Sequence, residues 1–486
     1  MAVDRCPPGF EGLEPRVRRW LDDEQTLNER IFIGTPKSRT SASKLPAKLQ
    51  PDQRASWRQE VVWLEREGAR IYGPLEERLA AAIGTAALGT GGQVPLLLHP
   101  RPTASHRRLA QALGRGTLGE VRATPTASYR SVVACVPDRP PVVLKLSLGA
   151  IIGRFRRHVD EIQVGTAVLI SWILDTIPIE MRDLFGLDWF PERSGLVDAQ
   201  RGEGWLLREL PSVLIEPAGG RLIPVFSLLS FCDGREPLLV ELIRREGGLA
   251  EDVVVEQILE PYVRALSYLL FVEGVHIEGH GQNVLIEWGA DERPTGRIVL
   301  RDLGDASVSI PLRLARRRPL PELDDDLPTT APHPLGTVAS NHEGLHGPTA
   351  VNRAHEVITA FGLNAFVWSI NQSLKRFFPG YDVELVRRRY LDLWRDAMMR
   401  LLPVKITIRE HPLGIVTDEV IEHVLRRIDW PSLGSIGGAA LPDGVEALRI
   451  GGRAHRRAGP VYDRLNCEWG ELYIHDGLPV FFRPSR

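Results

Sequence analysis

The stretch EGHGQNVLIEWGADERPTGRIVLRDLGD, residues 278–305, carries the pattern that decides the fold of this chain. It begins with a polar hexapeptide, continues as the apolar run NVLIEW, and turns at GADERPTG into a second apolar run, RIVL. Two such runs joined by a turn that contains Gly and Pro are typical of a β-hairpin. The pattern therefore predicts strand, turn and strand, with Asp302 near the end of the second strand.

Residues 251–273, just before this stretch, are predicted to form an amphipathic helix. Their apolar side chains recur at intervals of three and four residues, and Gly274 stands where a helix C-terminal cap belongs. A helix, a polar turn and a hairpin thus follow one another along the chain.

Other segments also carry local patterns. Residues 55–84 have apolar side chains at helical spacing and end in a Gly, so residues 1–92 are predicted to be helical. Residues 117–148 predict β-structure, with SVVACV and VVLKLSL joined as a hairpin by PDRPP. A helix is predicted from about residue 151 to 172, strands in GEGWLLREL and RLIPVFSLL, and helices again over 350–401.

Composition bounds the class of protein. The 486 residues predict two or three domains, or one large multi-lobed enzyme, and the net charge of −2 argues against a nucleic-acid partner. The four cysteines form no CxxC pair, which favours a reduced, cytoplasmic protein. The N-terminal residues lack the apolar core of a signal peptide. The most apolar run, residues 164–179, is short for a membrane span and is predicted to be a buried helix.

The polar hexapeptide and the hairpin together predict a metal–phosphate site. Carboxylate and amide oxygens bind Mg²⁺, and side chains at the ends of paired strands can face each other. Glu278, Gln282, Asn283 and Asp302 are therefore candidate ligands of one metal ion, with His280 between them to donate to a phosphate. The alternative is a polar turn that caps the helix. Because several polar residues cluster here, the metal–phosphate site is favoured over the polar turn.

Upstream residues offer the cations that a phosphate site needs. The first hairpin supplies Ser128, Arg130 and Lys145, and the segment that follows supplies Arg157. Lys145 stands within the apolar run VVLKLSL, where an ammonium is costly unless it is paired or bound to an anion. It could also reach solvent from an edge strand.

One interpretation is a kinase-like phosphotransferase. GRGTLGEV, residues 114–121, fits a Gly-rich phosphate loop, and VVLK resembles the strand that carries the kinase lysine. GHGQNVLIEW followed by IVLRDLGD resembles small-molecule kinases, in which an Asn and an Asp hold Mg²⁺. The expected catalytic Asp is absent, and Glu278 stands at that place.

A second interpretation accounts for more residues. The chain resembles the NRPS-independent siderophore synthetases, the aerobactin-synthetase (IucA/IucC) family. The motifs are PTASYRS (125–131), KLSLGAIIGRFRR (145–157), EGHGQN (278–283) and RDLGD (301–305). Weaker matches are VPLLLHP, LLRELP and LLPVKITIR, so the resemblance spans roughly residues 93–410.

This resemblance implies a role for each motif residue. Five residues would grip the ATP phosphates, namely Ser128, Arg130, Lys145, Arg157 and His280. Glu278, Gln282 and Asp302 would serve the Mg²⁺–nucleotide complex, with Asn283 close by. Arg157 and His280 would neutralise charge on the α-phosphate, and Lys145 would aid the departure of pyrophosphate.

The resemblance also implies an α+β fold shaped as a cupped hand around a central ATP cleft. Residues 1–92 would form a helical thumb, 93–220 the ATP-binding fingers, and 221–486 the palm with a mobile loop over 312–348. The enzyme would adenylate a citrate-like carboxylate and condense it with an amine or alcohol, giving an amide or ester, AMP and pyrophosphate. A homodimer is one assembly that it allows, and no membrane partner is expected.

The chain departs from the family in the pocket for the acid. The family's Thr four residues before Arg157 is Gly153 here, and of the early HP-x-HP motif only His99 and Pro100 remain. Lys405 and Arg409 are further candidates for binding the acid. Three hypotheses therefore stay open, namely an adenylate-forming synthetase, a phosphotransferase, and a divergent family member without catalytic activity.

Overall fold

The structure, a computed structural model of the chain, describes residues 7–25, 46, 49–84, 88–89, 91–152, 155–216, 220–230, 236–308, 318–319, 356–401, 404–408, 470–475 and 478–482. The chain divides into two compact units. The first comprises residues 1–172, 187–248 and 281–304, and the second comprises residues 173–186, 249–280 and 305–486. The predicted loop over 312–348 lies outside the described residues, apart from 318–319.

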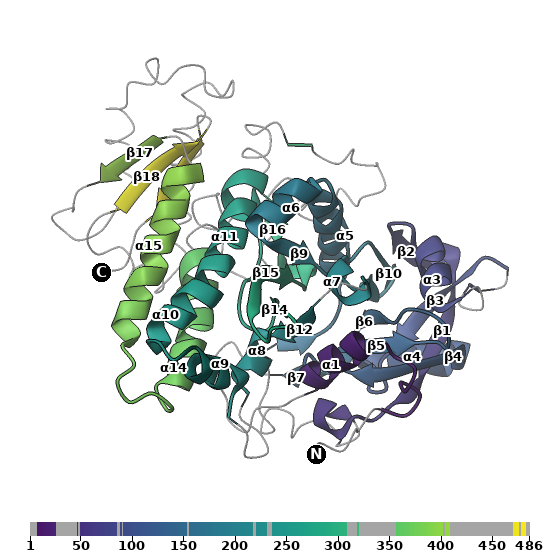
Figure 1. Ribbon diagram of the computed structural model, residues 1–486. Coiled ribbons are helices and arrows are strands. Elements are labelled where there is room, and N and C mark those ends of the chain that lie inside the picture. The colour runs from purple at the N-terminus through teal and green to yellow at the C-terminus, as the bar shows by residue number, and fades with distance from the viewer. Residues whose placement is uncertain are drawn as a thin grey trace. The chain divides into compact units, whose positions relative to one another are not determined.

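A large antiparallel sheet dominates the first unit (Figure 1). Its order among the described residues is β2 (Ala69–Tyr72), β10 (Ser194–Asp198), β11 (Glu203–Arg208), β6 (Val142–Leu146), β5 (Ser131–Cys135), β4 (Gly116–Pro125), β1 (Trp57–Glu65) and β3 (Gln93–Leu98). The predicted hairpin of β5 and β6 is confirmed, because Ser131 pairs with Lys145 and Val133 with Val143 in antiparallel register.

A smaller sheet of the same unit holds the hairpin on which the sequence analysis opened. Its order is β12 (Arg221–Pro224), β14 (Val284–Trp288), β15 (Pro294–Leu300) and β9 (Leu187–Trp189). β14 and β15 are antiparallel, as predicted, whereas β9 joins β15 in parallel. The remaining elements of the unit are α1 (Pro15–Glu24), η2 (Pro51–Gln53), η3 (Arg66–Gly68), α3 (Leu75–Ile83), α4 (Ala104–Leu113), β7 (Leu148–Ile152), β8 (Phe155–Arg157), α5 (Glu161–Asp175, which ends in the second unit), α7 (Ser212–Ile215), α8 (Val225–Leu228), α9 (Leu238–Glu246) and η7 (Leu303–Asp305, which also ends in the second unit).

Apolar side chains cover both faces of the large sheet. Val142 and Leu144 of β6 join a core with Leu79 of α3, while Val143 points the other way into a core with Val299 of β15. This alternation follows from the strand period of two. Lys145 follows the same period and therefore lies on the face of Val143, toward the smaller sheet.

Two helix predictions are wrong. Residues 57–65 and 69–72 form β1 and β2, and within residues 55–84 only α3 and the short 3-10 turn η3 (Arg66–Gly68) are helical. The helix predicted from about 151 begins at Glu161, because residues 148–152 and 155–157 form β7 and β8. The predicted domains 1–92, 93–220 and 221–486 stay a prediction.

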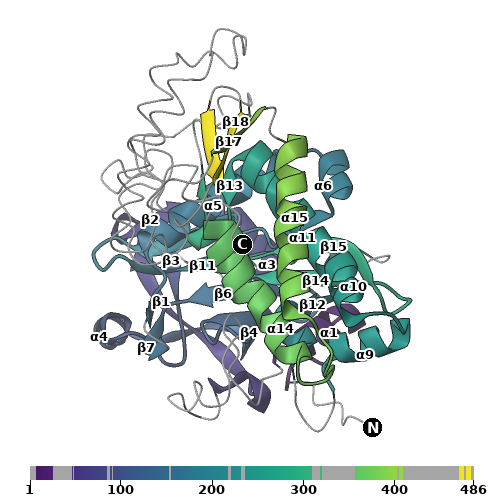
Figure 2. The ribbon, with the colours of Figure 1, turned by 90° about the vertical axis from the view of Figure 1, so that its left-hand side faces the viewer.

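The second unit is mainly helical among its described residues. The predicted helix over 251–273 is confirmed as α10 (Ala250–Val254), η5 (Val255–Leu259), α11 (Glu260–Tyr268) and η6 (Leu269–Glu273), and Gly274 caps it with a φ of 64°. Its other elements are α6 (Ile179–Phe185), β13 (Val275–His276), β16 (Ser307–Val308), η8 (Glu356–Val367), α14 (Trp368–Leu374), α15 (Val383–Leu401), β17 (Val404–Ile408), β18 (Gly470–His475) and β19 (Leu478–Phe482). α11 and α15 lie side by side (Figures 1 and 2).

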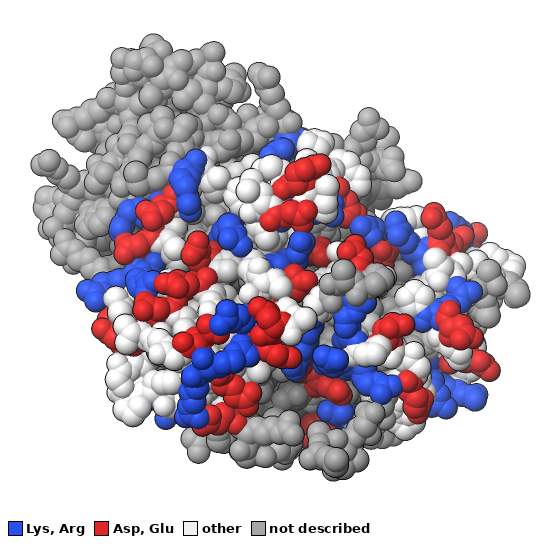
Figure 3. Space-filling view, in the orientation of Figure 1, with Lys and Arg blue, Asp and Glu red and all other residues white. Residues whose placement is uncertain are grey.

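Charged side chains of both signs are interspersed over the face in Figure 3, in keeping with the net charge of −2. In the described part of the chain, no individual helix combines the length and the apolar character needed to cross a bilayer; α5 and α6, bent by 96° at their junction, meet that criterion only as a pair.

Candidate active site

A cleft within the first unit brings together residues from four of the predicted motifs. Its volume, counted together with the open solvent at its mouth, is about 320 Å³. Its lining residues are Trp20, Thr126, Ser128, Ser131, Val143, Phe190, Arg208, Gln282, Asn283, Arg301 and Asp302.

Strand register explains why polar groups meet at one place on the large sheet. Ser131 of β5 lies opposite Lys145 of β6, and Arg208 of β11 lies opposite Val143. Directly opposed residues project to the same face. Ser131, Lys145 and Arg208 therefore lie on one face of the sheet, next to the apolar side chain of Val143.

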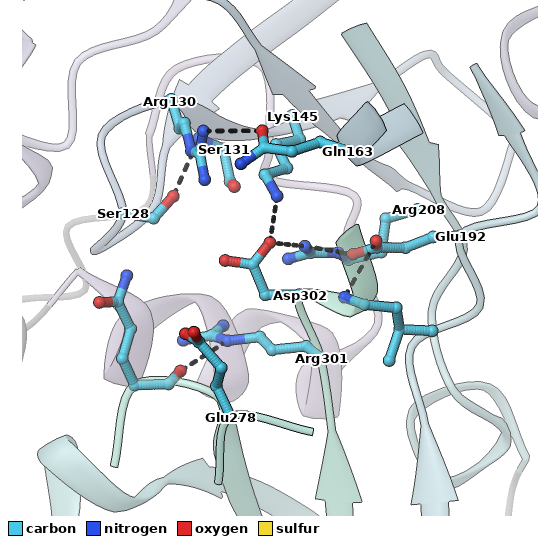
Figure 4. Close-up of polar contacts among 12 residues, drawn as sticks. Ser128, Arg130, Ser131, Lys145, Gln163, Glu192, Arg208, Glu278, Arg301 and Asp302 are labelled. Carbon is cyan, nitrogen blue, oxygen red and sulfur yellow. Dashed lines mark hydrogen bonds and ion pairs between the residues drawn. The ribbon is translucent and has the colours of Figure 1, made fainter. Parts of the chain in front are cut away.

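Lys145 and Asp302 form the central ion pair (Figure 4). The Lys145 side chain is only 1% exposed, and its ammonium donates to Oδ1 of Asp302. Nη2 of Arg208 lies 3.4 Å from the same oxygen. The predicted need of Lys145 for a partner is thus met by Asp302, two residues beyond β15.

The surrounding charges keep Asp302 ionised. Burial alone would raise the pKa of this carboxyl, but Lys145, Arg130 and Arg208 outweigh burial and hold the pKa well below its usual range. The backbone of Asp302 has a φ of 68°, in the left-handed region that Asp tolerates better than most residues.

The turn between β4 and β5 presents Ser128 to the cleft. The backbone N–H and the hydroxyl of Thr126 both donate to the carbonyl of Ser131 at 2.9 Å, and Ser128 Oγ accepts from the N–H of Ser131 at 3.0 Å. Arg130 is buried and donates to the carbonyl of His158 at 2.7 Å and to Gln163 Oε1 at 3.4 Å. Its positive charge also contributes to lowering the pKa of Asp302.

His99 supports the same turn from behind. It is 1% exposed, and its Nδ1 accepts from the backbone N–H of Arg101 at 3.0 Å. Nε2 must then carry the proton, and it donates to the carbonyl of Tyr129 at 3.0 Å. Burial lowers the pKa of His99 to about 4, so the imidazole is neutral at pH 7. Its predicted role in binding the acid stays a prediction.

Sequence reasoning missed the acidic residues that hold the cleft together. Glu24 at the end of α1 pairs with Arg301, which also donates through Nε to the carbonyl of Gln282 at 2.8 Å. Glu192, which is fully buried, accepts from Nε of Arg208 at 2.6 Å. Arg208 carried a signal like that of Lys145, because it is a cation in the apolar strand segment GWLLREL.

Glu278 and His280 belong to the second unit, whose boundary falls between His280 and Gly281. Nε2 of His280 lies 3.7 Å from Oε2 of Glu278. The carbonyl of Gly279 accepts from the hydroxyl of Tyr262 at 2.9 Å. A Cβ on Gly279 would lie 2.7 Å from both Leu266 and Tyr262, so only glycine fits between them.

The other predicted site residues are placed less fully. Arg157 is the last residue of β8, and not part of a helix as predicted. Lys405 lies in β17, but its side chain is outside the described part of the structure, as are Gly153 and Arg409. GRGTLGEV falls largely within β4, which pairs with β1 and β5.

The cleft lining offers one carboxylate and two side-chain amides as possible ligands of a metal ion. No group of three or more His, Cys, Asp or Glu side chains that could hold a metal occurs among the described residues. Asp302 is the acidic residue in the cleft lining, beside the amides of Gln282 and Asn283. Mg²⁺ usually binds through one or two carboxylates together with substrate phosphates. The carboxylate of Asp302 and the two amides fit this preference.

Comparisons with known proteins identify the fold. No protein-family model and no curated protein matches the sequence. ATP-bound aerobactin synthetase IucA from Klebsiella pneumoniae is similar in structure, with a TM-score of 0.53, 17% identity, and coverage of 72% of this chain and 64% of that one. Aerobactin synthetase IucC from the same organism is similar with a TM-score of 0.52 and 17% identity, and the match covers 73% of this chain and 64% of IucC. Petrobactin biosynthesis protein AsbB from Bacillus anthracis is similar with a TM-score of 0.54 and 16% identity, and the match covers 71% of this chain and 61% of AsbB.

The chain thus spans less than two thirds of the length of each of these three proteins. It shares their fold, a mixed α+β architecture with a large antiparallel sheet. The predicted resemblance to siderophore synthetases is confirmed at the level of fold.

Proposed function

We propose that this protein is an ATP-dependent synthetase that adenylates a citrate-like carboxylate and condenses it with an amine or alcohol, in the biosynthesis of a siderophore or related product. The observation that carries the proposal is the ion pair of the buried Lys145 with Asp302, which lines the cleft together with Arg208 and Ser128. The likeness in fold to an ATP-bound synthetase supports it. The thumb, fingers and palm lobes around an ATP cleft, and the three predicted domains, are part of the proposal.

The cations of the cleft could serve a polyphosphate. Lys145, Arg208 and Arg301 lie at the cleft, and their charges are balanced by Asp302, Glu192 and Glu24 respectively. Charge-assisted hydrogen bonds to phosphate are strong, and they gain strength where water is excluded. The ammonium of Lys145 is already held in place by Asp302, so a phosphate oxygen would meet a donor that needs little reorganisation.

The reaction follows two steps. A carboxylate oxygen of the acid attacks the α-phosphorus of ATP, the bond from that phosphorus to the bridging oxygen breaks, and pyrophosphate leaves. An amine or hydroxyl then attacks the acyl carbon of the acyl-adenylate, loses a proton, and AMP departs with the bond electrons. Lys145 would neutralise charge on the departing pyrophosphate.

Further residues enter the proposal through the motif resemblance. Arg157, His280, Ser128 and Arg130 would bind phosphates, and Glu278, Gln282 and Asp302 would hold Mg²⁺ near Asn283. When bound, Mg²⁺ offsets phosphate charge. His99, Gly153, Lys405 and Arg409 stay proposals for the acid pocket, and a homodimer stays a proposal for the assembly.

Product analysis tests the proposal. The purified protein is incubated with Mg²⁺, ATP, hydroxylamine and each of a panel of polycarboxylic acids, and nucleotides and hydroxamates are quantified. AMP, pyrophosphate and a hydroxamate in equal amounts are expected, with loss of all three in Lys145→Met. ADP would favour a phosphotransferase instead. Absence of turnover, with ATP binding unchanged in Asp302→Asn, would favour a non-catalytic protein.

A further inference from the structure

Glu192 makes two kinds of bond around the central ion pair, although it does not line the cleft. It lies between β9 and β10 and is fully buried. One of its oxygens, Oε1, pairs with the guanidinium of Arg208 through both Nε and Nη2. The other, Oε2, accepts from the backbone N–H of Leu303 at 3.2 Å.

These bonds form a closed ring that includes Asp302. Glu192 binds Arg208, Arg208 reaches Asp302, and Asp302 is joined by its peptide bond to Leu303, which returns to Glu192 (Figure 4). The ring fixes the left-handed backbone of Asp302 from one side, while Lys145 fixes its carboxylate from the other. A non-glycine residue in this conformation persists only where its surroundings hold it.

Charge balance gives Glu192 a second effect. With Glu192 present, two buried cations, Lys145 and Arg208, face two carboxylates. Arg208 is bound closely to Glu192, and its Nη2 lies 3.4 Å from Oδ1 of Asp302. Lys145 is therefore the closer partner of Asp302. Without the charge of Glu192, Arg208 and Lys145 would compete for one carboxylate.

We propose that Glu192 is a positioning residue of this cleft, which holds Arg208 back from Asp302 and so keeps the Lys145–Asp302 pair in its working geometry. The functional part of this inference rests on the proposed synthetase activity. The geometric part does not, because it concerns only how the three side chains share their charges.

Chemical labelling of Lys145 tests the geometric part. Glu192→Gln keeps the size of the side chain and one oxygen acceptor but removes the charge. Acylation of Lys145 by a small amine-reactive ester is followed by mass spectrometry in the folded protein, with the exposed Lys375 as internal reference. We expect the relative labelling rate of Lys145 to rise by about tenfold in Glu192→Gln, as Arg208 takes over Asp302.

Glu209→Gln is the matched control. Glu209 follows Arg208 directly and pairs with Arg78 at 3.1 Å and with Arg193, away from the cleft lining. In Glu209→Gln, the labelling of Lys145 relative to Lys375 should equal that of the wild type. A merely structural Glu192 would lower the urea midpoint of Glu192→Gln while leaving the Lys145 ratio at the wild-type value, and that result would overturn the proposal.

Kinetics test the functional part. For Glu192→Gln we expect kcat for AMP formation to fall by about tenfold while KM for ATP changes by less than about threefold, because misplaced charges cost more in the transition state than in binding. Wild-type kcat in Glu192→Gln would overturn the role in positioning. If the wild type itself forms no AMP, the proposed function fails, and the labelling ratio still decides whether Glu192 positions Lys145 and Asp302.

Discussion

Protonation of His99 should loosen the turn that carries Ser128 and Arg130. The imidazole is neutral and buried, and it donates through Nε2 to the carbonyl of Tyr129 while Nδ1 accepts from Arg101. A proton added to Nδ1 would oppose the N–H of Arg101, donor against donor, within a site that is 1% exposed. Acid should therefore open residues 125–131.

The magnitude follows from the pKa of His99. It falls from an ordinary value of 6.5 to about 4 on burial. In the opened turn the imidazole meets water and regains the higher pKa, so between these two values the open state binds more protons than the closed one. The stabilisation is complete above pH 6.5 and is lost as pH falls to 4, by about 1.4 kcal/mol for each pH unit and roughly 3 kcal/mol in total. The protection of the turn should fall by about 300-fold.

Hydrogen exchange with mass spectrometry measures this change. Peptides covering residues 125–131 are followed between pH 7 and pH 4, with rates corrected for the intrinsic pH dependence of exchange, in the wild type and in His99→Gln. Gln retains a donor for Tyr129 but does not titrate. Residues 294–300 of β15 serve as an internal reference. The reasoning is refuted if protection of the turn is independent of pH in the wild type, or if His99→Gln shows the same pH dependence.

Four further substitutions probe the two units. Asp302→Asn leaves the ammonium of Lys145 without its carboxylate and should lower stability by about 3 kcal/mol in urea unfolding; adding Lys145→Met should restore part of that loss, and strictly additive effects would speak against the pair. Gly279→Ala places a Cβ 2.7 Å from Leu266 and Tyr262 and should cost about 2–3 kcal/mol, seen as a lower Tm. Tyr262→Phe removes one hydrogen bond to Gly279 and should cost only about 1 kcal/mol; equal Tm shifts for both variants would contradict this ranking.

Local sequence patterns predicted much of the secondary structure and one side of the site. Strands β5, β6, β14 and β15, and the helix over residues 250–273, were readable because each buries one face or both faces at its own period. Lys145 was singled out because an ammonium in an apolar strand needs a partner.

The same reasoning failed in β1, where apolar and polar residues do not alternate along the strand. In β1 the apolar residues Trp57, Val61, Val62 and Leu64 fall at helical intervals, yet the segment is a strand between β3 and β4. Neighbouring strands there cover the segment on both edges, and those contacts are not local. Tertiary pairing thus overrode the local pattern.

The sequence by itself determined which side chains are available to the site. It encodes two hairpins that each end in ionisable or polar side chains, and a buried lysine that must be paired. What only the tertiary structure decided is which groups meet. Asp302 stands 157 residues from Lys145 along the chain, and Glu24 stands 277 residues from Arg301. Such pairings depend on strand order and on the packing of one sheet against another. Local periodicity encodes the elements but not their partners, and so the ring of Glu192, Arg208 and Asp302 could be seen only in the folded chain.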